Sequence, residues 1–392
     1  MSEARAATAM LWPAFPITIA ALTAFFLPLS VLPAEARADG TPTTVAALTS
    51  AAFLAGVVTG ELGASAALNR LGPRRAIVVG LSAMAIPTAL VTLDMAPAMT
   101  AGLSAIRGMG FALVAVATAA LVAHGSKRAD LGRTLGWYGL AAGVPCVAAL
   151  PLGVFFSAQN MAEAGMLVAA GAAACGIPFA FLLPLDSLVA APRGLRSLLA
   201  RASATRQAGA LALGATASGA LIAYAPVVIA PSDPVLAAAM LLLTSVAATA
   251  ARLPAGRLSD RVGPARLIAP ALIVATAGVG LCAGAGWVLP AVGAVGVGLG
   301  FGALQNATLH AMSTAAPVPL LGAVSALWNL AYDVGLLAGA LIFSAIAAVI
   351  PSPAIVPTLA LCLAVASAVV IKALRPTHAL DPGVTSVPGV SE

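Results

Sequence analysis

The sequence predicts an all-α integral membrane protein whose twelve transmembrane helices form two pseudo-symmetric six-helix bundles. Its 392 residues are 61% hydrophobic and only 8% charged, with a mean hydropathy of +1.05. Soluble domains carry roughly 25% charged residues. The apolar residues also gather into twelve runs, and each is long enough to cross a hydrocarbon core about 30 Å thick as a helix.

The twelve runs are too long for barrel strands and lack the alternation of lipid-facing and lumen-facing residues that barrels show, so helices are expected. Their approximate bounds are 10–33, 44–68, 75–94, 97–123, 134–157, 164–186, 208–230, 233–253, 265–286, 288–312, 321–349 and 354–374.

The first run resembles a cleaved signal peptide in one respect. Arg5 precedes it and the small-residue stretch Ala34–Ala38 follows it. Its apolar stretch is nevertheless about 20 residues long, whereas signal peptides have about 7–15. We therefore expect an uncleaved first helix.

A short stretch occurs twice and indicates an internal duplication. Asn69–Arg75 and Asp260–Arg266 superimpose their Arg, Gly, Pro and final Arg at an offset of 191 positions, since 260 − 69 = 191. Each copy lies between two apolar runs, as expected of a duplicated membrane protein. We predict an N-terminal bundle over 1–187, a cytoplasmic linker rich in Arg over 188–207, and a C-terminal bundle with a short tail over 208–392.

The basic residues predict the orientation. If the N-terminus is inside, nearly all Lys and Arg fall on the inner side, Arg37 falls in an outer loop and Arg107 falls within a span. By the positive-inside rule both termini are then cytoplasmic, in a multi-pass protein of the cell membrane. The net charge of +6 is explained by topology and anionic lipid, so no nucleic-acid partner is expected.

No pattern of a soluble enzyme stands out. The sequence has no Walker motif, no HExxH and no GxSxG in a strand context. The four cysteines lie within apolar runs without a close Cys or His neighbour. We therefore expect a non-enzyme with no metal and no cofactor, and no ATP-driven pumping by this chain.

The segment from Gly256 to Arg266 resembles the signature loop of the major facilitator superfamily, in which a Gly and three residues precede Asp-Arg-x-Gly and a basic end. In that family the loop joins helices two and three and recurs, usually weakened, between helices eight and nine. Here the later copy is the stronger one, because the earlier copy has Ser65 in place of the Gly and Asn69 in place of the Asp. The resemblance covers essentially the whole chain and implies transport by alternating access.

The family resemblance implies that the two loops act as a latch that breaks and re-forms as the bundles rock. Gly256 permits close helix approach, Gly263 permits a tight reversal, and Asp260 accepts hydrogen bonds from an Arg or a helix N-terminus. Plain anchoring by positive charge is the alternative, and the neutral Asn69 favours it for the first copy. The candidate gating residues are Asn69, Arg70, Gly72, Arg74, Gly256, Asp260, Arg261 and Gly263.

Three ionisable residues lie at membrane depth: Glu61, Arg107 and Asp333. A charge left in lipid costs a few kcal/mol or more, so each is a functional candidate. Glu61 and Asp333 are the candidate proton-coupling residues, although Glu61 also suits a structural carboxylate. Arg107 resembles the Arg of the family's fourth-helix motif, one turn out of register. It is predicted to bind an anionic group or to pair with a carboxylate, and a packing ion pair is its alternative.

The run containing Asp333 has the richest binding surface. Asn329 and Asp333 form one polar stripe, and Trp328 and Tyr332 form the adjacent aromatic one. The candidate substrate-binding residues are Arg107, Trp137, Tyr138, Gln305, Asn306, Trp328, Asn329 and Tyr332. Trp137 corresponds to Trp328 at the repeat offset, since 328 − 137 = 191. An aromatic belt at the membrane interface is the alternative reading of both Trp residues.

The sequence as a whole predicts a secondary active transporter. Because no ATP motif is present, protons are the expected energy source. Proton-coupled efflux of a small organic molecule or drug is preferred, since the pattern looks most like the drug and metabolite exporters of the family. Proton-coupled uptake of a sugar, nucleoside or small organic acid is the alternative. The expected partners are the substrate, protons and the lipid bilayer, and the chain is expected to be monomeric.

Overall fold

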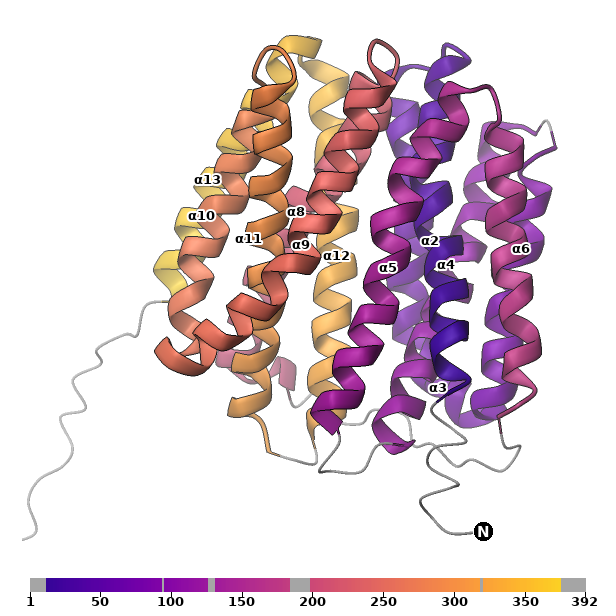
Figure 1. The fold of residues 1–392 in the computed structure, drawn as a ribbon, viewed down its shortest axis with the longest axis vertical. Helices are drawn as coiled ribbons and strands as arrows, with labels where there is room; N and C mark the ends of the chain where they lie inside the picture. The colour runs from indigo at the N-terminus through magenta and orange to yellow at the C-terminus, as the bar shows by residue number, and fades with distance from the viewer. Residues whose placement is uncertain (1–11, 94, 126–130, 184–197, 318–319, 375–392) are drawn as a thin grey trace, which may run out of the picture.

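A computed structural model describes residues 12–93, 95–125, 131–183, 198–317 and 320–374, and in these ranges the chain is helical with short connections and no strand (Figure 1). The α-helices are α2 (Ala14–Ala38), α3 (Thr43–Leu90), α4 (Pro97–Gly125), α5 (Leu131–Ala158), α6 (Ala162–Ala180), α8 (Ala202–Tyr224), α9 (Pro234–Val262), α10 (Pro264–Leu281), α11 (Val288–Ala315), α12 (Leu321–Val349) and α13 (Ser352–Leu374). A π-helical turn, η1 (Ala225–Ile229), extends α8.

The helix α3 provides two membrane crossings. Its 48 residues would extend about 72 Å as one straight helix, more than twice the hydrocarbon thickness. Gly72 interrupts it with a φ of 73° and a ψ of 164°, and Pro73 begins the second part. Eleven helices of the described residues are long and apolar enough to span a membrane, and the division of α3 raises the number of crossings to twelve. The predicted fold class is confirmed.

Several helix ends differ from the predicted runs, and the largest difference is in α9, which continues to Val262 instead of ending at 253. The first helix continues to Ala38, so Arg37 lies in its last turn and not in a loop. The sixth helix ends at Ala180, earlier than predicted. The seventh helix, α8, changes to π geometry at Ala225, where the N–H of Ala230 bonds to the carbonyl of Ala225. Pro226 explains this change because it lacks the N–H that an α-helical bond would need.

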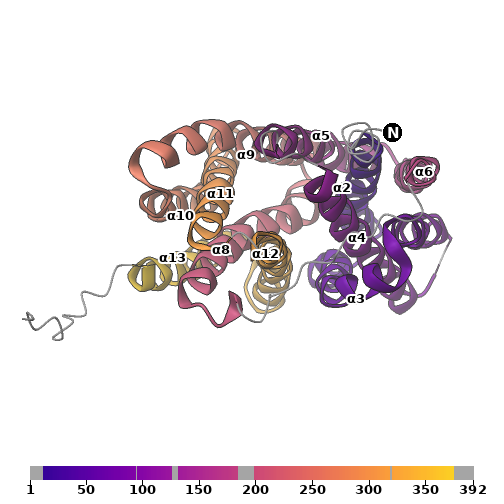
Figure 2. The same cartoon turned by 90° about the horizontal axis from the view of Figure 1, so that it is seen from below.

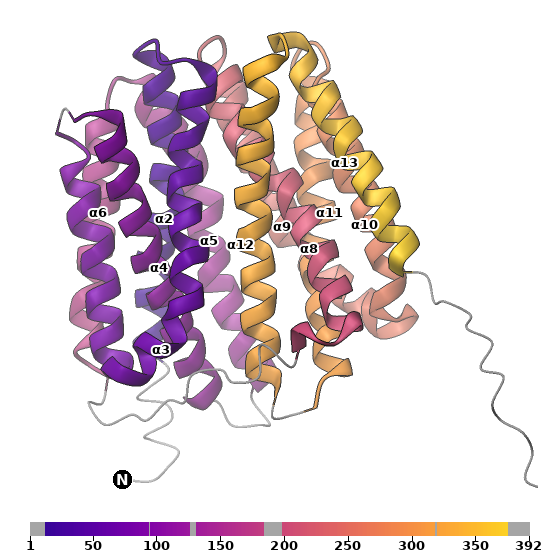
Figure 3. The same cartoon turned by 180° about the vertical axis from the view of Figure 1, so that it is seen from behind.

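The helices α2 to α6 lie on one side of the molecule and α8 to α13 on the other (Figures 1 and 3). The reversals at Gly72 and Gly263 lie at the same end of the helices, here called the Gly72 end. The opposite end contains Arg37 and is here called the Arg37 end. The division at 1–187, 188–207 and 208–392 stays a prediction, because residues 184–197 lie outside the described part of the chain.

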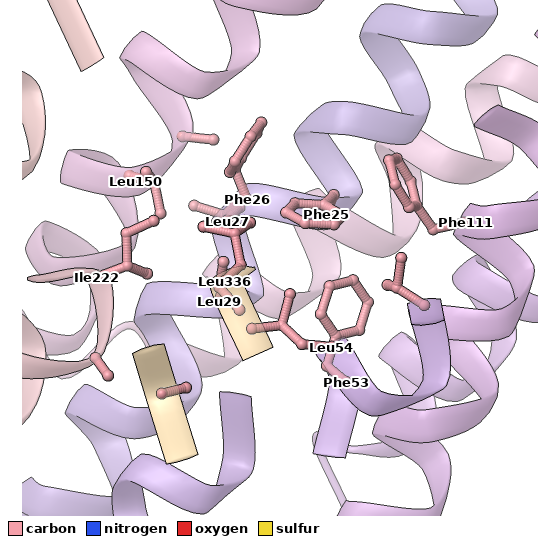
Figure 4. Packing of buried hydrophobic residues seen from close by; sticks show 14 of the residues in the cluster. Phe25, Phe26, Leu27, Leu29, Phe53, Leu54, Phe111, Leu150, Ile222 and Leu336 are labelled. Atoms are coloured by element: carbon pink, nitrogen blue, oxygen red, sulfur yellow. The ribbon is translucent and has the colours of Figure 1, made fainter. Parts of the chain in front are cut away.

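The two helix groups meet along two lines. α3 packs against α12, and α5 packs against α9, as the view along the helices also shows (Figure 2). A shared hydrophobic cluster lies between these lines and combines Phe25 and Leu54 of the first group with Ile222 and Leu336 of the second (Figure 4). The ring of Phe25 contacts that of Phe111 with centroids 4.5 Å apart. This packing places the polar residues of α3 and α12 next to one another.

Candidate functional site

The site begins with two carboxyl groups on helices from opposite groups. Asp333 of α12 is 5% exposed, and Glu61 of α3 is partly buried. Asp333 lies twelve residues after Leu321 and Glu61 eleven before Gly72, or about 18 and 16 Å along their helices. Both side chains therefore lie near the middle of the membrane.

The structure brings these two carboxyl groups into direct contact. The Glu61 and Asp333 side chains lie within hydrogen-bonding range of each other. A hydrogen bond between two carboxyl groups requires a proton on one of them, because an ionised carboxylate only accepts. Two unprotonated carboxylates at this separation would repel each other strongly in a medium of low dielectric constant. The pair therefore holds at least one proton.

The second carboxyl oxygen of Glu61 remains unused. Glu61 Oε2 is buried and has no hydrogen-bond partner within the described residues. A buried acceptor left unpaired costs about 1–3 kcal/mol. The geometry therefore leaves one acceptor of the pair available to another proton or to a donor on a bound molecule.

An aromatic stack lies beside Asp333 on α12 and α11. Tyr332 stacks on Phe301 with ring centroids 5.5 Å apart, and Trp328 stacks on Tyr332 at 6.1 Å. The indole Nε1 of Trp328 donates a hydrogen bond of 3.2 Å to Thr308 Oγ1. Because this bond fixes the indole and satisfies its donor, the partly exposed ring of Trp328 is held rigidly on the stack, next to the carboxyl pair.

Two amide side chains of α11 have different surroundings. Gln305 is 3% exposed, and its Oε1 has no hydrogen-bond partner among the described residues. Asn306 faces Gly256 of α9, where an added Cβ would lie 3.3 Å from Asn306 Nδ2. Both amides thus have a buried oxygen without a partner among the described residues, and Asn306 also contributes to the packing of α9 on α11. Asn329 lies half-buried on α12, one turn before Asp333.

Arg107 has a neighbour that the sequence did not predict. Its guanidinium lies over the ring of Phe53, with Cζ 5.0 Å from the centroid, and the residue is 1% exposed. Nε and Nη1 have no hydrogen-bond partner in the described part of the chain, and Arg107 forms no ion pair there. The predicted pairing with a carboxylate is therefore absent from this conformation, in which Glu61 and Asp333 bind each other.

Arg252 is the site residue that sequence reasoning missed. It lies on α9, ten residues before Val262, and its guanidinium is within electrostatic range of Tyr332 and Cys146. Its position corresponds to Glu61 at the repeat offset, since 252 − 61 = 191. The expectation that Arg107 is the only basic side chain at this depth was wrong. The repeat offset was the signal that could have found Arg252.

Two predicted binding residues, Trp137 and Tyr138, have side chains that the structure does not describe. Their backbone belongs to α5. The nearest described part of α5 contacts α9, where Cys146 Sγ donates to Ser245 Oγ at 3.5 Å. The role of the two aromatic residues stays a prediction.

At the Arg37 end one side chain joins the two helix groups. Arg37 Nε donates a hydrogen bond of 3.2 Å to the carbonyl oxygen of Val227, in the π-helical turn after α8. Its Nη1 donates to the carbonyl of Thr41. Glu35, two residues before Arg37, accepts a bond of 3.0 Å from Ser157 Oγ. A charged side chain thus bridges the two groups at this end.

The comparisons with known proteins agree with this architecture. The family model described as Major Facilitator Superfamily matches residues 5–340. The chain belongs to the major facilitator superfamily. The search of curated proteins finds no match.

Solved structures of major facilitator fold resemble the whole chain. The nucleoside transporter NupG in a mutant form has a TM-score of 0.73 at 12% identity, covering 93% of this chain and 98% of its own. The peptide transporter POT in complex with alafosfalin has a TM-score of 0.74 at 12% identity, covering 95% and 98%. At such identities the likeness establishes the fold. As a major facilitator protein the chain is a multi-pass membrane transporter.

The signature loops of this major facilitator protein show the backbone geometry that the glycines suggested. Gly72 and Gly263 have φ values of 73° and 88°, in the left-handed region that favours Gly. Arg74 lies over the ring of Phe181, with Cζ 4.7 Å from the centroid. Arg70 and Arg261 are exposed. The basic side chains therefore lie at the Gly72 end, as both the latch and the anchoring interpretations require.

Asp260 has a partner within its own helix group. Its Oδ1 lies 3.8 Å from His310 Nδ1 of α11, and its side chain is 72% exposed. The sequence had suggested an Arg or a helix N-terminus as the partner. A protonated His310 would attract this carboxylate, so His310 joins the candidate latch residues.

The latch interpretation predicts unequal effects at the two loops. Asp260→Asn should change the balance between the two access states more than Asn69→Ala does, because only Asp260 provides a charge. The measurement is the rate of maleimide labelling of a single cysteine placed at the exposed Leu71 or Leu258, in a chain whose four native cysteines are replaced. Equally small changes from both substitutions would favour plain anchoring.

Proposed function

We propose that this chain is a proton-coupled secondary transporter of a small organic molecule. The observation that supports the proposal is the close pair of Glu61 and Asp333, which joins the two helix groups near mid-membrane. Charged or polar groups at this depth are costly and usually belong to a transport pathway. A pair that holds a proton between two bodies that rock apart suits proton coupling.

The chemistry of coupling follows from the location of the pair. The proton is retained while α3 and α12 are in contact, because separate carboxylates would repel. When the helices move apart, each carboxyl group becomes solvated on its own and favours the ionised form, so the proton is released. A molecule that binds the aromatic stack and changes the α3–α12 separation therefore changes proton occupancy. This reciprocity is the linkage that a coupled transporter needs.

The bond from Arg37 to Val227 supports an alternating-access motion. It joins the helix groups at the Arg37 end, so opening that end requires its loss. A charge-assisted hydrogen bond contributes about 1.5–3 kcal/mol. That magnitude is large enough to bias one access state and small enough to break in each cycle.

We expect Arg37→Gln to shift the balance towards opening of the Arg37 end. The reason is that the Gln side chain is too short to reach the backbone carbonyls of both Val227 and Thr41. Maleimide labelling of a single cysteine at Thr43, beside this bridge, should become faster in the variant. Arg75→Gln at the opposite end is the matched control and should leave that rate unchanged. Equal rates in the Arg37→Gln variant and the parent would contradict the bridge.

The direction of transport has two candidates. Export by antiport is the one we propose first, on the resemblance of the sequence to drug and metabolite exporters. Uptake by symport is the second, and the fold likeness to a nucleoside transporter and a peptide transporter gives it comparable support. In each case the proton moves down its gradient.

The test is proton flux in proteoliposomes that enclose a pH-sensitive dye. A panel of small organic molecules is added outside, first with no gradient and then with a pH gradient imposed in each direction. In an antiporter, substrate entry drives protons out and raises the internal pH. In a symporter, substrate entry carries protons in and lowers it. Substrate transport with no pH change in either direction would overturn proton coupling.

We further propose an orientation and a division of the chain. Both termini are cytoplasmic, since Arg70, Arg75, Arg257, Arg261 and Arg266 all lie near the reversals at the Gly72 end. Residues 1–187 and 208–392 form the two bundles, with 188–207 as linker, and the chain acts as a monomer in the cell membrane. Protease access to a tag at either terminus, in vesicles of known orientation, tests the orientation.

A further inference from the structure

Arg252 is a basic side chain near the contact of the helix groups that the proposed coupling does not use. It is ten residues from Val262, the last residue of α9, or about 15 Å along the helix. Glu61 is about 16 Å from Gly72, so the two residues related by the repeat offset stand at similar depth. Arg252 interacts electrostatically with Cys146 of α5 and Tyr332 of α12. It therefore faces the region that α5, α9 and α12 enclose.

The guanidinium of Arg252 lacks a protein counter-ion within the described residues. Its Nε is buried without a hydrogen-bond partner, and no described carboxylate forms an ion pair with it. Glu61 and Asp333 use each other as partners. Arg252 is partly exposed, and its buried Nε is a donor left unpaired at some cost, so the position is favourable for an anion that arrives from outside.

We propose that Arg252 binds the anionic group of the transported molecule, which is therefore a small organic anion of the carboxylate class. The inference rests on the proposed transport function and names the substrate class of the same site. Arg donates two parallel N–H bonds that match a carboxylate. The partly exposed ring of Trp328, supported by Tyr332 and Phe301, supplies an aromatic surface for the apolar body, and Gln305 Oε1 accepts from a hydroxyl or amine on it.

In this arrangement the substrate anion and the coupled proton bind at two separate places. The anion neutralises Arg252 on α9, while the proton stays on the Glu61–Asp333 pair on α3 and α12. The charge of Arg252 is then compensated as the site changes access, independently of the protonation of the carboxyl pair. The same carboxyl pair repels an anion placed next to it, which favours binding at Arg252 over binding near Asp333.

The test measures binding and needs no pH gradient. Purified protein in detergent at constant pH is heated with a panel of aliphatic, aromatic and α-hydroxy monocarboxylates and, in parallel, with the primary amide of each. At least one carboxylate should raise the melting temperature more than its amide does. Arg252→Gln should abolish that difference, with affinity reduced about tenfold or more. Arg257→Gln, on the exposed side of α9, should keep it.

A second variant decides the outcome if Arg252→Gln folds poorly. Arg252→Lys keeps the charge but loses the two-pronged geometry, so it should bind the same carboxylate more weakly than the parent and still better than the amide. The proposal is overturned if no carboxylate is preferred over its amide, or if Arg252→Gln or Arg252→Lys binds the carboxylate as the parent does. Because no proton flux is measured, failure here leaves proton coupling intact, and failure of coupling leaves this result intact.

Discussion

Asp333→Asn is expected to abolish proton-driven uphill transport while substrate exchange continues. The amide still donates a hydrogen bond to Glu61, so the contact between α3 and α12 survives. Asn cannot release a proton, however, and the pair remains fixed in the equivalent of its protonated state. The accumulation of substrate under a pH gradient should fall to that of protein-free liposomes, and counterflow of labelled substrate should persist.

The matched control for Asp333→Asn is Asn329→Ala, one turn away on the same helix. It removes a neutral polar group without changing protonation, so it should weaken substrate binding and retain coupling. Both variants are first checked for membrane insertion and monodispersity. Uphill transport by Asp333→Asn with the parent's pH dependence would show that Asp333 is not the coupling group. Glu61→Gln would then be the decisive variant.

Gly108→Ala is expected to destabilise the protein strongly. A Cβ at this position would lie 2.1 Å from the carbonyl oxygen of Phe53 and 2.6 Å from the backbone nitrogen of Val57. These are backbone atoms that cannot move aside without shifting α3. Overpacking of this kind costs about 1–3 kcal/mol or more. The thermal midpoint in detergent should therefore fall clearly below that of the parent.

Gly102→Ala on the same helix is the control for Gly108→Ala. An added Cβ there meets nothing within 4 Å. Because Ala is a better helix former than Gly, this change should be neutral or stabilising by up to about 1 kcal/mol. A thermal midpoint that falls in Gly108→Ala and stays equal or rises in Gly102→Ala would confirm close α3–α4 packing. Equal effects would contradict it.

The number and position of the helices could be predicted from the sequence because the bilayer imposes a simple rule. Every span needs about 20 apolar residues with internally satisfied backbone groups. The runs at 44–68 and 75–94 were separated correctly even though Gly72 joins them within one helical segment. The repeat offset of 191 likewise predicted that Asn69 and Asp260 would lie near equivalent reversals.

The sequence by itself identified three of the side chains that carry the cost of charge in the membrane, but it did not identify Arg252 or determine the partners of the other three. Hydropathy identified Glu61, Arg107 and Asp333, since each interrupts an apolar run. Only the tertiary structure decided that Glu61 meets Asp333 across the α3–α12 contact, that Arg107 lies over Phe53, and that Arg252 faces the same region. The physical reason is that depth follows from distance along a single helix, whereas partners depend on the rotation and packing of helices far apart in the chain.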